Sequence, residues 1–147
     1  MEIVQARPDQ SDALTAICVA AKSHWGYSRE VLATWQSDLT ISPDSVASNP
    51  TYIALLNGEY AGFYQLWLGA LPARLEHLWV QPDSMGKGVG RALLQHAQGQ
   101  AKAALLIDSD PHAEAFYIAC GARRVARVPA PIPQQPDRFL PRMELPF

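Results

Sequence analysis

One stretch of this chain, from Arg74 to Leu94, constrains the fold most, because it combines three kinds of local structure without interruption. Residues 75–80 alternate in character, which predicts a short strand. The alternation defines two faces: Leu75, His77 and Trp79 on one, and Glu76, Leu78 and Val80 on the other. Pro82 ends the strand, since proline has no N–H to donate. Glycines at positions 86, 88 and 90 then lead into an apolar run that is typical of a helix.

The glycine loop between this strand and helix is suited to bind an anion. Its backbone N–H groups lie at the positive end of a helix dipole, with no side chains to cover them, and phosphate is the anion favoured there. The spacing G-x-G-x-G matches neither the G-x-x-x-x-G-K-[ST] loop nor the G-x-G-x-x-G dinucleotide fingerprint. Asp108 lies where a ribose-binding acid would be expected. A dinucleotide-binding domain and a purely structural glycine turn therefore both remain open.

The same residues resemble a known family. The run V-Q-P-D-S-M-G-K-G-V-G-R-A-L-L, residues 80–94, resembles the [RQ]-x-x-G-x-[GA] signature of the GNAT superfamily of acyl-CoA-dependent N-acetyltransferases. Gly88 and Gly90 fill the two small positions, and Met85 stands where Arg or Gln is usual.

A second motif follows in the expected order. D-P-H-A-E-A-F-Y-I-A-C-G-A, residues 110–122, resembles the later GNAT element N-x-x-A-x-x-F-Y-x-x-x-G-F. Asp110 replaces the usual Asn, and Ala122 replaces the usual Phe. Two ordered motifs are more specific than either alone, and together they cover about residues 75–128.

The length of 147 residues suits a single domain that spans residues 1–147. The net charge of −2, without a basic block, predicts no nucleic-acid surface. The sequence has neither a long apolar run nor a signal-peptide pattern, which predicts a cytoplasmic protein without membrane contact. Cys18 and Cys120 lack metal-ligand spacing, so we expect two buried, inert thiols and no metal site.

Local patterns predict eleven regular elements with a loop at residues 40–50. The predicted strands are residues 3–6, 51–56, 60–68, 74–80, 104–107, 123–128 and 139–145, the last interrupted at Pro141. The predicted helices are residues 9–22, 29–39 (capped by Ser28), 89–102 and 111–120. The order β-α-α-β-β-β-α-β-α-β-β predicts an α+β sandwich with a mixed, mostly antiparallel sheet flanked by helices. It is also the GNAT order, and the resemblance implies that strands 74–80 and 104–107 splay apart around the cofactor.

Acetyl transfer needs a site for the pyrophosphate, donors for the oxyanion, a base for the amine and an acid for the leaving thiolate. The resemblance implies acetyl-CoA as co-substrate, held by the strand end and the glycine loop. These cofactor-binding residues are Leu78, Trp79, Val80, Met85, Gly86, Lys87, Gly88, Val89, Gly90 and Arg91. Lys87 and Arg91 are equally well explained as solvated side chains.

Two residues are the candidates for catalysis. Tyr117 falls on the tyrosine of the family's F-Y pair, which in many members protonates the thiolate; the structural alternative is a core aromatic. Glu76 is a carboxylate within an apolar strand, predicted on the face of Val80, and it is the candidate general base. A salt-bridged Glu76 is the alternative. We expect His77 to be structural unless a β-bulge re-aims it.

For the acceptor pocket we single out the aromatic and polar segment between the first two helices, which lines that pocket in the GNAT fold: His24, Trp25 and Tyr27. Aromatic walls hold alkyl or ammonium groups, although these side chains could equally pin the loop to the core. Arg138 and Arg142 follow a proline-rich loop and are expected to be surface charges, with binding of a substrate carboxylate as the alternative.

The sequence thus predicts an acyltransferase, an N-acetyltransferase that transfers acetyl from acetyl-CoA to a primary amine by direct attack in a ternary complex. The alternative is a non-catalytic acyl-CoA-binding module or sensor. The acceptor, a small-molecule or peptide amine, stays open among polyamine, aminoglycoside-like amine, amino acid and protein N-terminus. A homodimer, with the final strand pairing across a two-fold axis, also stays open.

Overall fold

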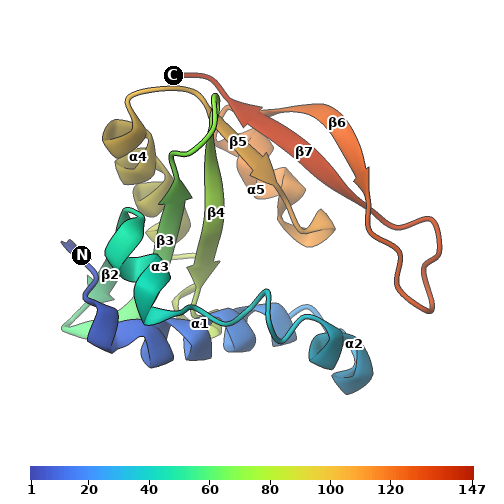
Figure 1. The fold of residues 1–147 in the computed structure, drawn as a ribbon, viewed down its shortest axis with the longest axis horizontal. Helices are drawn as coiled ribbons and strands as arrows, with labels where there is room; N and C mark the ends of the chain where they lie inside the picture. The colour runs from blue at the N-terminus through green and yellow to red at the C-terminus, as the bar shows by residue number, and fades with distance from the viewer.

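The computed structural model describes residues 1–147 and contains one seven-stranded sheet in the order β1-β2-β3-β4-β5-β7-β6 (Figure 1). The strands are β1 (Glu2–Gln5), β2 (Thr51–Leu56), β3 (Glu59–Trp67), β4 (Ala73–Val80), β5 (Leu105–Asp108), β6 (Arg123–Pro129) and β7 (Phe139–Leu145). The helices are α1 (Ser11–Ser23), α2 (Arg29–Thr34), α3 (Pro43–Ser48), α4 (Val89–Ala101) and α5 (Glu114–Ala119). Short 3-10 turns are η1 (Pro8–Gln10), η2 (Pro82–Ser84) and η3 (Pro111–Ala113). Only β4 and β5 pair in parallel, so the predicted α+β class with a mostly antiparallel sheet is confirmed.

Helices cover both faces of the sheet, and each face has its own hydrophobic core (Figure 1). On one face α4 and α5 pack over a cluster of 16 buried residues that includes Tyr64 and Leu93. On the other face α1 packs over a smaller cluster of 9 buried residues that includes Ile17 and Phe63. Phe63 and Tyr64 are neighbours in β3 and point to opposite faces, as the alternation of a strand requires.

Two elements differ from the sequence-based expectations. Helix α2 ends at Thr34 instead of residue 39, although the Ser28 hydroxyl caps it as predicted by accepting from the Val31 N–H at 3.2 Å. The segment predicted as loop contains α3, whose start carries two standard signals. The Ser42 hydroxyl accepts from the Ser45 N–H at 3.1 Å, and Pro43 occupies the first helical turn.

The final strand is also better paired than predicted. β7 is continuous through Pro141 and lies between β5 and β6, so it has no free edge to pair across a two-fold axis. Pro141 lies beyond the last β5–β7 pair, Asp108 with Arg142, so its missing N–H removes no bond of that ladder, and its carbonyl accepts from the Ser109 N–H at 3.0 Å. No helix in the structure has the length and apolar character needed to cross a bilayer.

The sheet splits between β4 and β5, as the resemblance implied. These strands pair at only two positions, Ala73 with Leu105 and Arg74 with Leu106, and then diverge. Beyond Arg74, β4 therefore has a neighbour on one edge only, and this break in the sheet positions the site described below.

A β-bulge in β4 overturns part of the predicted side-chain alternation. Gln65 of β3 pairs with His77 and the next residue, Leu66, pairs with Leu75, so Glu76 is the extra residue. Leu75 consequently packs in the same core as Leu78 and Val80, whereas Trp79 packs in the other. The prediction that Leu75 shares a face with His77 and Trp79 is wrong. So is the prediction that Glu76 shares a face with Val80, since Glu76 pairs instead with Arg74.

Candidate active site

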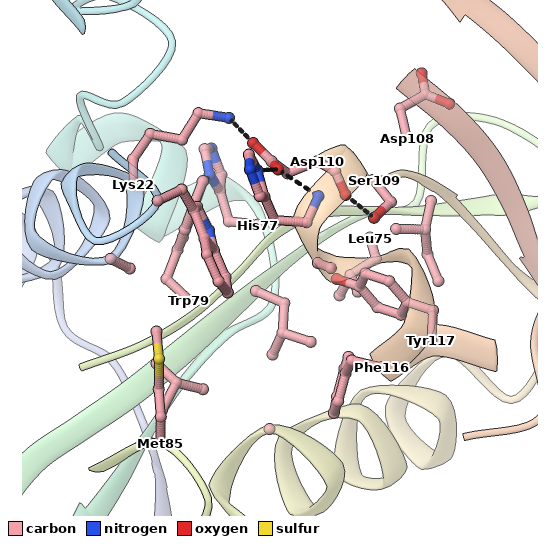
Figure 2. Close-up of a pocket in the computed structure, with 18 of the residues that line it drawn as sticks. Lys22, Leu75, His77, Trp79, Met85, Asp108, Ser109, Asp110, Phe116 and Tyr117 are labelled. Atoms are coloured by element: carbon pink, nitrogen blue, oxygen red, sulfur yellow. Dashed lines mark hydrogen bonds and ion pairs between the residues drawn. The ribbon is translucent and has the colours of Figure 1, made fainter. Parts of the chain in front are cut away.

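A cavity of about 700 Å³ opens where β4 and β5 diverge. Its walls come from α1, the turns that follow α1 and α2, β4, the loop into α4 and the start of that helix, the end of β5 and the loop after it, α5 and the β6–β7 loop. The lining residues used below are Lys22, Trp25, Trp35, Glu76, His77, Leu78, Trp79, Val80, Met85, Gly86, Gly88, Val89, Gly90, Arg91, Asp110, His112, Phe116, Tyr117 and Arg138. Figure 2 shows Lys22 and Asp110 approaching each other from opposite walls of this cavity.

One wall is a run of free backbone donors at the start of α4. The N–H groups from Gly86 to Arg91 donate to no acceptor within the protein, and the first helical bond is from Ala92 to the Gly88 carbonyl. Gly86 and Gly88 have φ angles of +78° and +80°, which place both in the region that glycine adopts without strain. Six consecutive free donors at the positive end of a 13-residue helix favour an anion, which is the ligand that the sequence predicts for this loop.

Gly90 has a different role, which is close packing. A Cβ atom at Gly90 would lie 3.1 Å from the Phe116 ring and 3.6 Å from Val80 Cγ2. The missing side chain therefore lets α4 approach α5 and β4 closely. Because α4 begins at the cavity, this contact also fixes where its free N–H groups point.

The free edge of β4 supplies further backbone groups. The Gln81 N–H donates to the Ala61 carbonyl of β3 at 2.8 Å. In an antiparallel ladder the direction of these groups alternates, so Leu78 and Val80 direct their N–H and C=O groups away from β3. No strand pairs with β4 on that side, and these groups face the gap toward β5.

Tyr117 lies on the cavity wall as well as in the core around α4 and α5, and it is 6% exposed. Its hydroxyl bonds to no protein group, and burial raises the pKa of Tyr117 well above its ordinary value. The side chain is therefore a neutral phenol with a free proton. Phe116 precedes it and packs against Gly90, and Figure 2 shows both rings side by side on α5.

Glu76 and His77 each have one of their two polar side-chain atoms bonded within the protein. Arg74 Nε donates to Glu76 Oε1 at 3.0 Å, and the Glu76 side chain is 40% exposed, so Glu76 is the salt-bridged residue of the structural alternative. His77 Nδ1 accepts from Trp79 Nε1 at 3.0 Å, which leaves the proton on Nε2. Burial lowers the pKa of His77, so the ring is neutral.

Asp110 is the centre of a polar cluster at the far end of the cavity (Figure 2). Its Oδ2 accepts from Lys22 Nζ at 2.5 Å and from the Tyr27 hydroxyl at 2.9 Å. Its Oδ1 accepts from the backbone N–H of His112 at 2.8 Å and lies 2.7 Å from His112 Nδ1. Burial would raise the pKa of Asp110, but the charge of Lys22 and these hydrogen bonds hold it at about 2. The carboxylate is ionised, so the proton between it and His112 is on Nδ1.

The remaining nitrogen of His112 is available for chemistry. No protein group bonds to Nε2, and the ring stacks on Trp25 with centroids 5.1 Å apart and planes at 5°. An acid that holds Nδ1–H and leaves Nε2 unprotonated is the arrangement by which enzymes orient a histidine base. The sequence analysis did not assign His112 to the site. The D-x-H spacing at a helix start was the signal for this pair.

The acceptor segment predicted from sequence is only partly on the cavity wall. Trp25 lines the cavity, and Tyr27 lies directly behind the wall, bonded to Asp110. His24 packs edge-on against Trp25, with centroids 5.1 Å apart, and does not line the cavity. The structure adds residues that the sequence reasoning missed as wall residues: Lys22, Trp35, Asp110 and His112.

Arg138 and Arg142, which were expected on the surface, are both engaged. The Arg138 side chain is 4% exposed and reaches the cavity from the β6–β7 loop, so the surface assignment is wrong for it. Arg142 Nε donates to Asp108 Oδ1 at 2.7 Å, and Arg74 Nη2 donates to Asp108 Oδ2 at 2.9 Å. Asp108 therefore links three strands beside the split. Both of its oxygens are engaged by arginines, so it is not available to bind a ribose.

The remaining predicted cofactor contacts divide into two groups. Met85 and Arg91 line the cavity, and Arg91 Nη2 also donates to the Ala119 carbonyl at 3.2 Å. Lys87 does not line it.

Cys18 is buried, and burial raises its pKa to about 12, as an inert thiol requires. Cys120 is only partly buried, contrary to expectation.

Comparison with known proteins agrees with this geometry. A model of the acetyltransferase (GNAT) domain matches residues 47–121, slightly more than half of the chain. No curated protein matches the sequence. The fold is similar to that of a GCN5-related N-acetyltransferase (aminotransferase, class-II) from Rhodopseudomonas palustris, with 23% identity and a TM-score of 0.78 over 99% of this chain and 95% of that one.

Two further solved structures contain coenzyme A or its acetyl form. PaiA N-acetyltransferase from Thermoplasma acidophilum, in complex with coenzyme A, has 17% identity and a TM-score of 0.79 over 99% of this chain and 98% of that one. YncA, a putative acetyltransferase from Salmonella typhimurium with its cofactor acetyl-CoA, has 19% identity and a TM-score of 0.70 over 99% and 93%. These structures agree with the chain in fold, and the matching domain model identifies it as a member of the GNAT acetyltransferase family.

Proposed function

We propose that this protein transfers the acetyl group of acetyl-CoA to a primary amine by direct attack in a ternary complex. The observation that carries the proposal is the continuity of one cavity. The free N–H groups of Gly86 and of residues 88–91, the unpaired edge of β4 and the Tyr117 phenol all belong to residues that line it. An anion site, an extended backbone edge and a proton donor, in this order, fit a pyrophosphate, a pantetheine arm and a thioester.

The chemistry follows from these groups. The free amine attacks the thioester carbonyl carbon, and the oxyanion that forms needs donors, which the N–H groups of Leu78 and Val80 can supply. The carbon–sulfur bond then breaks, and the departing thiolate takes the proton of Tyr117. Because burial raises the pKa of Tyr117, the phenol keeps this proton until the thiolate leaves.

The amine must lose a proton, since an alkylamine has a pKa of about 10.4. Two groups on the wall can accept it. Glu76 was predicted for this role, but one of its oxygens is bonded to Arg74. His112 has a free Nε2, because Asp110 holds the proton on Nδ1. We assign the base to His112, oriented by Asp110, and retain Glu76 as the competing assignment.

The test combines binding with turnover. Thermal shift with acetyl-CoA, CoA and NAD measures cofactor binding, and CoA release over a broad amine panel measures transfer. At about 100 times its Kd a ligand stabilises the fold by about 2.7 kcal/mol, which produces a clear shift in Tm. No shift with acetyl-CoA or CoA would refute the proposal. A shift without CoA release from any amine would leave the acyl-CoA-binding module as the better description.

Tyr117→Phe tests the acid directly. It removes only the hydroxyl, so kcat should fall by roughly ten-fold or more while the acetyl-CoA shift persists. Tyr60→Phe is the matched control, because Tyr60 lies on β3, and its hydroxyl bonds only to Gln10, at 2.8 Å. Equal turnover in both variants would remove Tyr117 from the mechanism.

A further inference from the structure

Arg138 is a buried cation on the cavity wall whose hydrogen-bonding capacity is only partly used. Nη1 donates to the Ala130 carbonyl at 3.0 Å, and Nη2 donates to the Tyr27 hydroxyl at 3.1 Å. A guanidinium has five N–H donors. The Nε donor and one donor on each terminal nitrogen therefore have no acceptor in the protein.

Asp110, the one carboxylate near Arg138, cannot accept the remaining hydrogen bonds of the guanidinium. Oδ2 of Asp110 lies 3.8 Å from Nη2, too far for a hydrogen bond. Each oxygen of Asp110 already accepts two hydrogen bonds, from Lys22 and Tyr27 on one side and from two nitrogens of His112 on the other. Asp110 is saturated by groups other than Arg138.

The balance of buried charges also leaves Arg138 without a counter-charge. Lys22 and Arg138 are both buried, with 8% and 9% of their surfaces exposed, and Asp110 is the single carboxylate that forms an ion pair with either. Asp38 also lines the cavity, but it is exposed and forms no ion pair. This end of the cavity therefore carries one positive charge more than its buried carboxylate balances.

Aromatic rings compensate for part of this charge. The Arg138 guanidinium lies 5.2 Å from the Trp35 ring centroid and 5.4 Å from that of Tyr27. Cation–π contacts of this kind stabilise a buried cation by less than a hydrogen-bonded counter-charge does. A buried charge without a hydrogen-bonded counter-charge is costly, so the cavity favours an occupant that brings an anion.

We propose that the acceptor amine carries a carboxylate, as a free amino acid does, and that Arg138 binds this carboxylate and makes it the specificity-determining group. A planar guanidinium with adjacent free donors matches the two oxygens of a carboxylate. Lys22 adds charge at the same end, and the wall of Trp25 and Trp35 accommodates the apolar part of the acceptor. This inference rests on the proposed acetyl transfer, because it concerns the acceptor end of the same cavity.

The experiment compares each standard amino acid with its carboxamide and with the amine that lacks the carboxyl group. Two readouts are used for every trio. The first is kcat/KM from acetyl-CoA-dependent release of CoA, and the second is calorimetric binding to the CoA-bound protein, which needs no turnover. The variants are Arg138→Gln and Arg138→Lys. Arg127→Gln is the matched control, because Arg127 is exposed on β6 and outside the cavity.

In the unmodified protein the preferred amino acid should surpass its carboxamide by about 10- to 100-fold in both readouts, the range of a hydrogen-bonded charged pair. Arg138→Gln should reduce this ratio to near one. Arg138→Lys should keep part of it, and Arg127→Gln should keep all of it. The acetyl-CoA thermal shift reports whether each variant is folded, and Arg138→Lys serves if the glutamine variant is not.

The failures of the two proposals are distinguishable. Transfer to carboxamides or simple amines as fast as to amino acids would overturn the role of Arg138 and leave the acetyltransferase intact. Arg138-dependent binding of amino acids without any transfer would support the carboxylate site and overturn the enzyme. Neither binding nor transfer with any amino acid would overturn the carboxylate proposal outright.

Discussion

The ion pair between Lys22 and Asp110 should be the main electrostatic link between the two walls of the cavity. Lys22 Nζ and Asp110 Oδ2 are 2.5 Å apart, and the side chains are 11% and 8% exposed. Removing one partner of such a pair leaves the other buried and uncompensated, at a cost of about 3–5 kcal/mol. Replacing both partners at once costs far less, because no charge is then left alone.

The two single variants should differ, because the surviving partners differ. In Lys22→Met, Asp110 keeps its bonds to Tyr27 and His112 and the attraction of Arg138 nearby. We therefore expect the free energy of unfolding to fall by about 2 kcal/mol. In Asp110→Asn, Lys22 and Arg138 face each other without a carboxylate between them, so we expect the free energy of unfolding to fall by about 3–5 kcal/mol. Asn still accepts the His112 N–H, which preserves the cap of η3.

Urea unfolding of the unmodified protein, the two single variants and the double variant at pH 7 measures the coupling energy between Lys22 and Asp110. A coupling of about 2 kcal/mol or more is expected, and additivity within about 0.5 kcal/mol would refute the buried pair. The loss in Asp110→Asn should also shrink at alkaline pH. Burial lowers the pKa of Lys22, so in this variant its folded pKa lies below the unfolded one. The penalty is then fully present below the folded pKa and is lost as pH rises from the folded to the unfolded pKa.

Three further predictions concern the site. Gly88→Ala should lower the free energy of unfolding by about 1 kcal/mol through strain at φ +80°, and it should weaken acetyl-CoA binding in thermal-shift titrations. Unchanged affinity would exclude the loop as the anion site. His112→Gln should lower kcat/KM by about 100-fold, while Glu76→Gln has little effect; the reverse result would assign the base to Glu76. Gly62→Ala should lower the free energy of unfolding by about 1–3 kcal/mol in urea, because its Cβ would lie 2.6 Å from the Trp79 carbonyl oxygen; wild-type stability would show that the strands adjust freely.

Local signals were sufficient for most of the fold. The hairpin at Asn57-Gly58 is an example, because both residues adopt positive φ, 53° and 80°, a preference encoded by the residues themselves. The bulge at Glu76 is the opposite case. It depends on how β4 pairs with Gln65 and Leu66 of β3, so nothing within the strand's own sequence indicates it. One extra residue then reassigned the side chains on either side of it to different faces.

The two halves of the cavity differ in the same way. The free N–H groups from Gly86 to Arg91 are contiguous in sequence, so a motif of five residues was enough to predict them. The cluster around Asp110 joins positions far apart in the chain. Lys22 lies 88 residues before Asp110, and Tyr27 lies 111 residues before Arg138. No spacing rule connects such residues, and only the folded chain shows that they meet.

Asp108 and Asp110 show why position in the fold, more than residue type, decides what a carboxylate does here. Asp108 ends β5 and pairs with two arginines, whereas Asp110 follows two residues later and pairs with Lys22, with Arg138 3.8 Å away. The cations of Asp108, Arg74 and Arg142, belong to neighbouring strands, and they hold the sheet together at the point where β4 and β5 part. The cations near Asp110 come from α1 and the β6–β7 loop, which are the walls of the cavity. The first acid therefore fixes where the split begins, and the second brings the walls together around the space that the split creates.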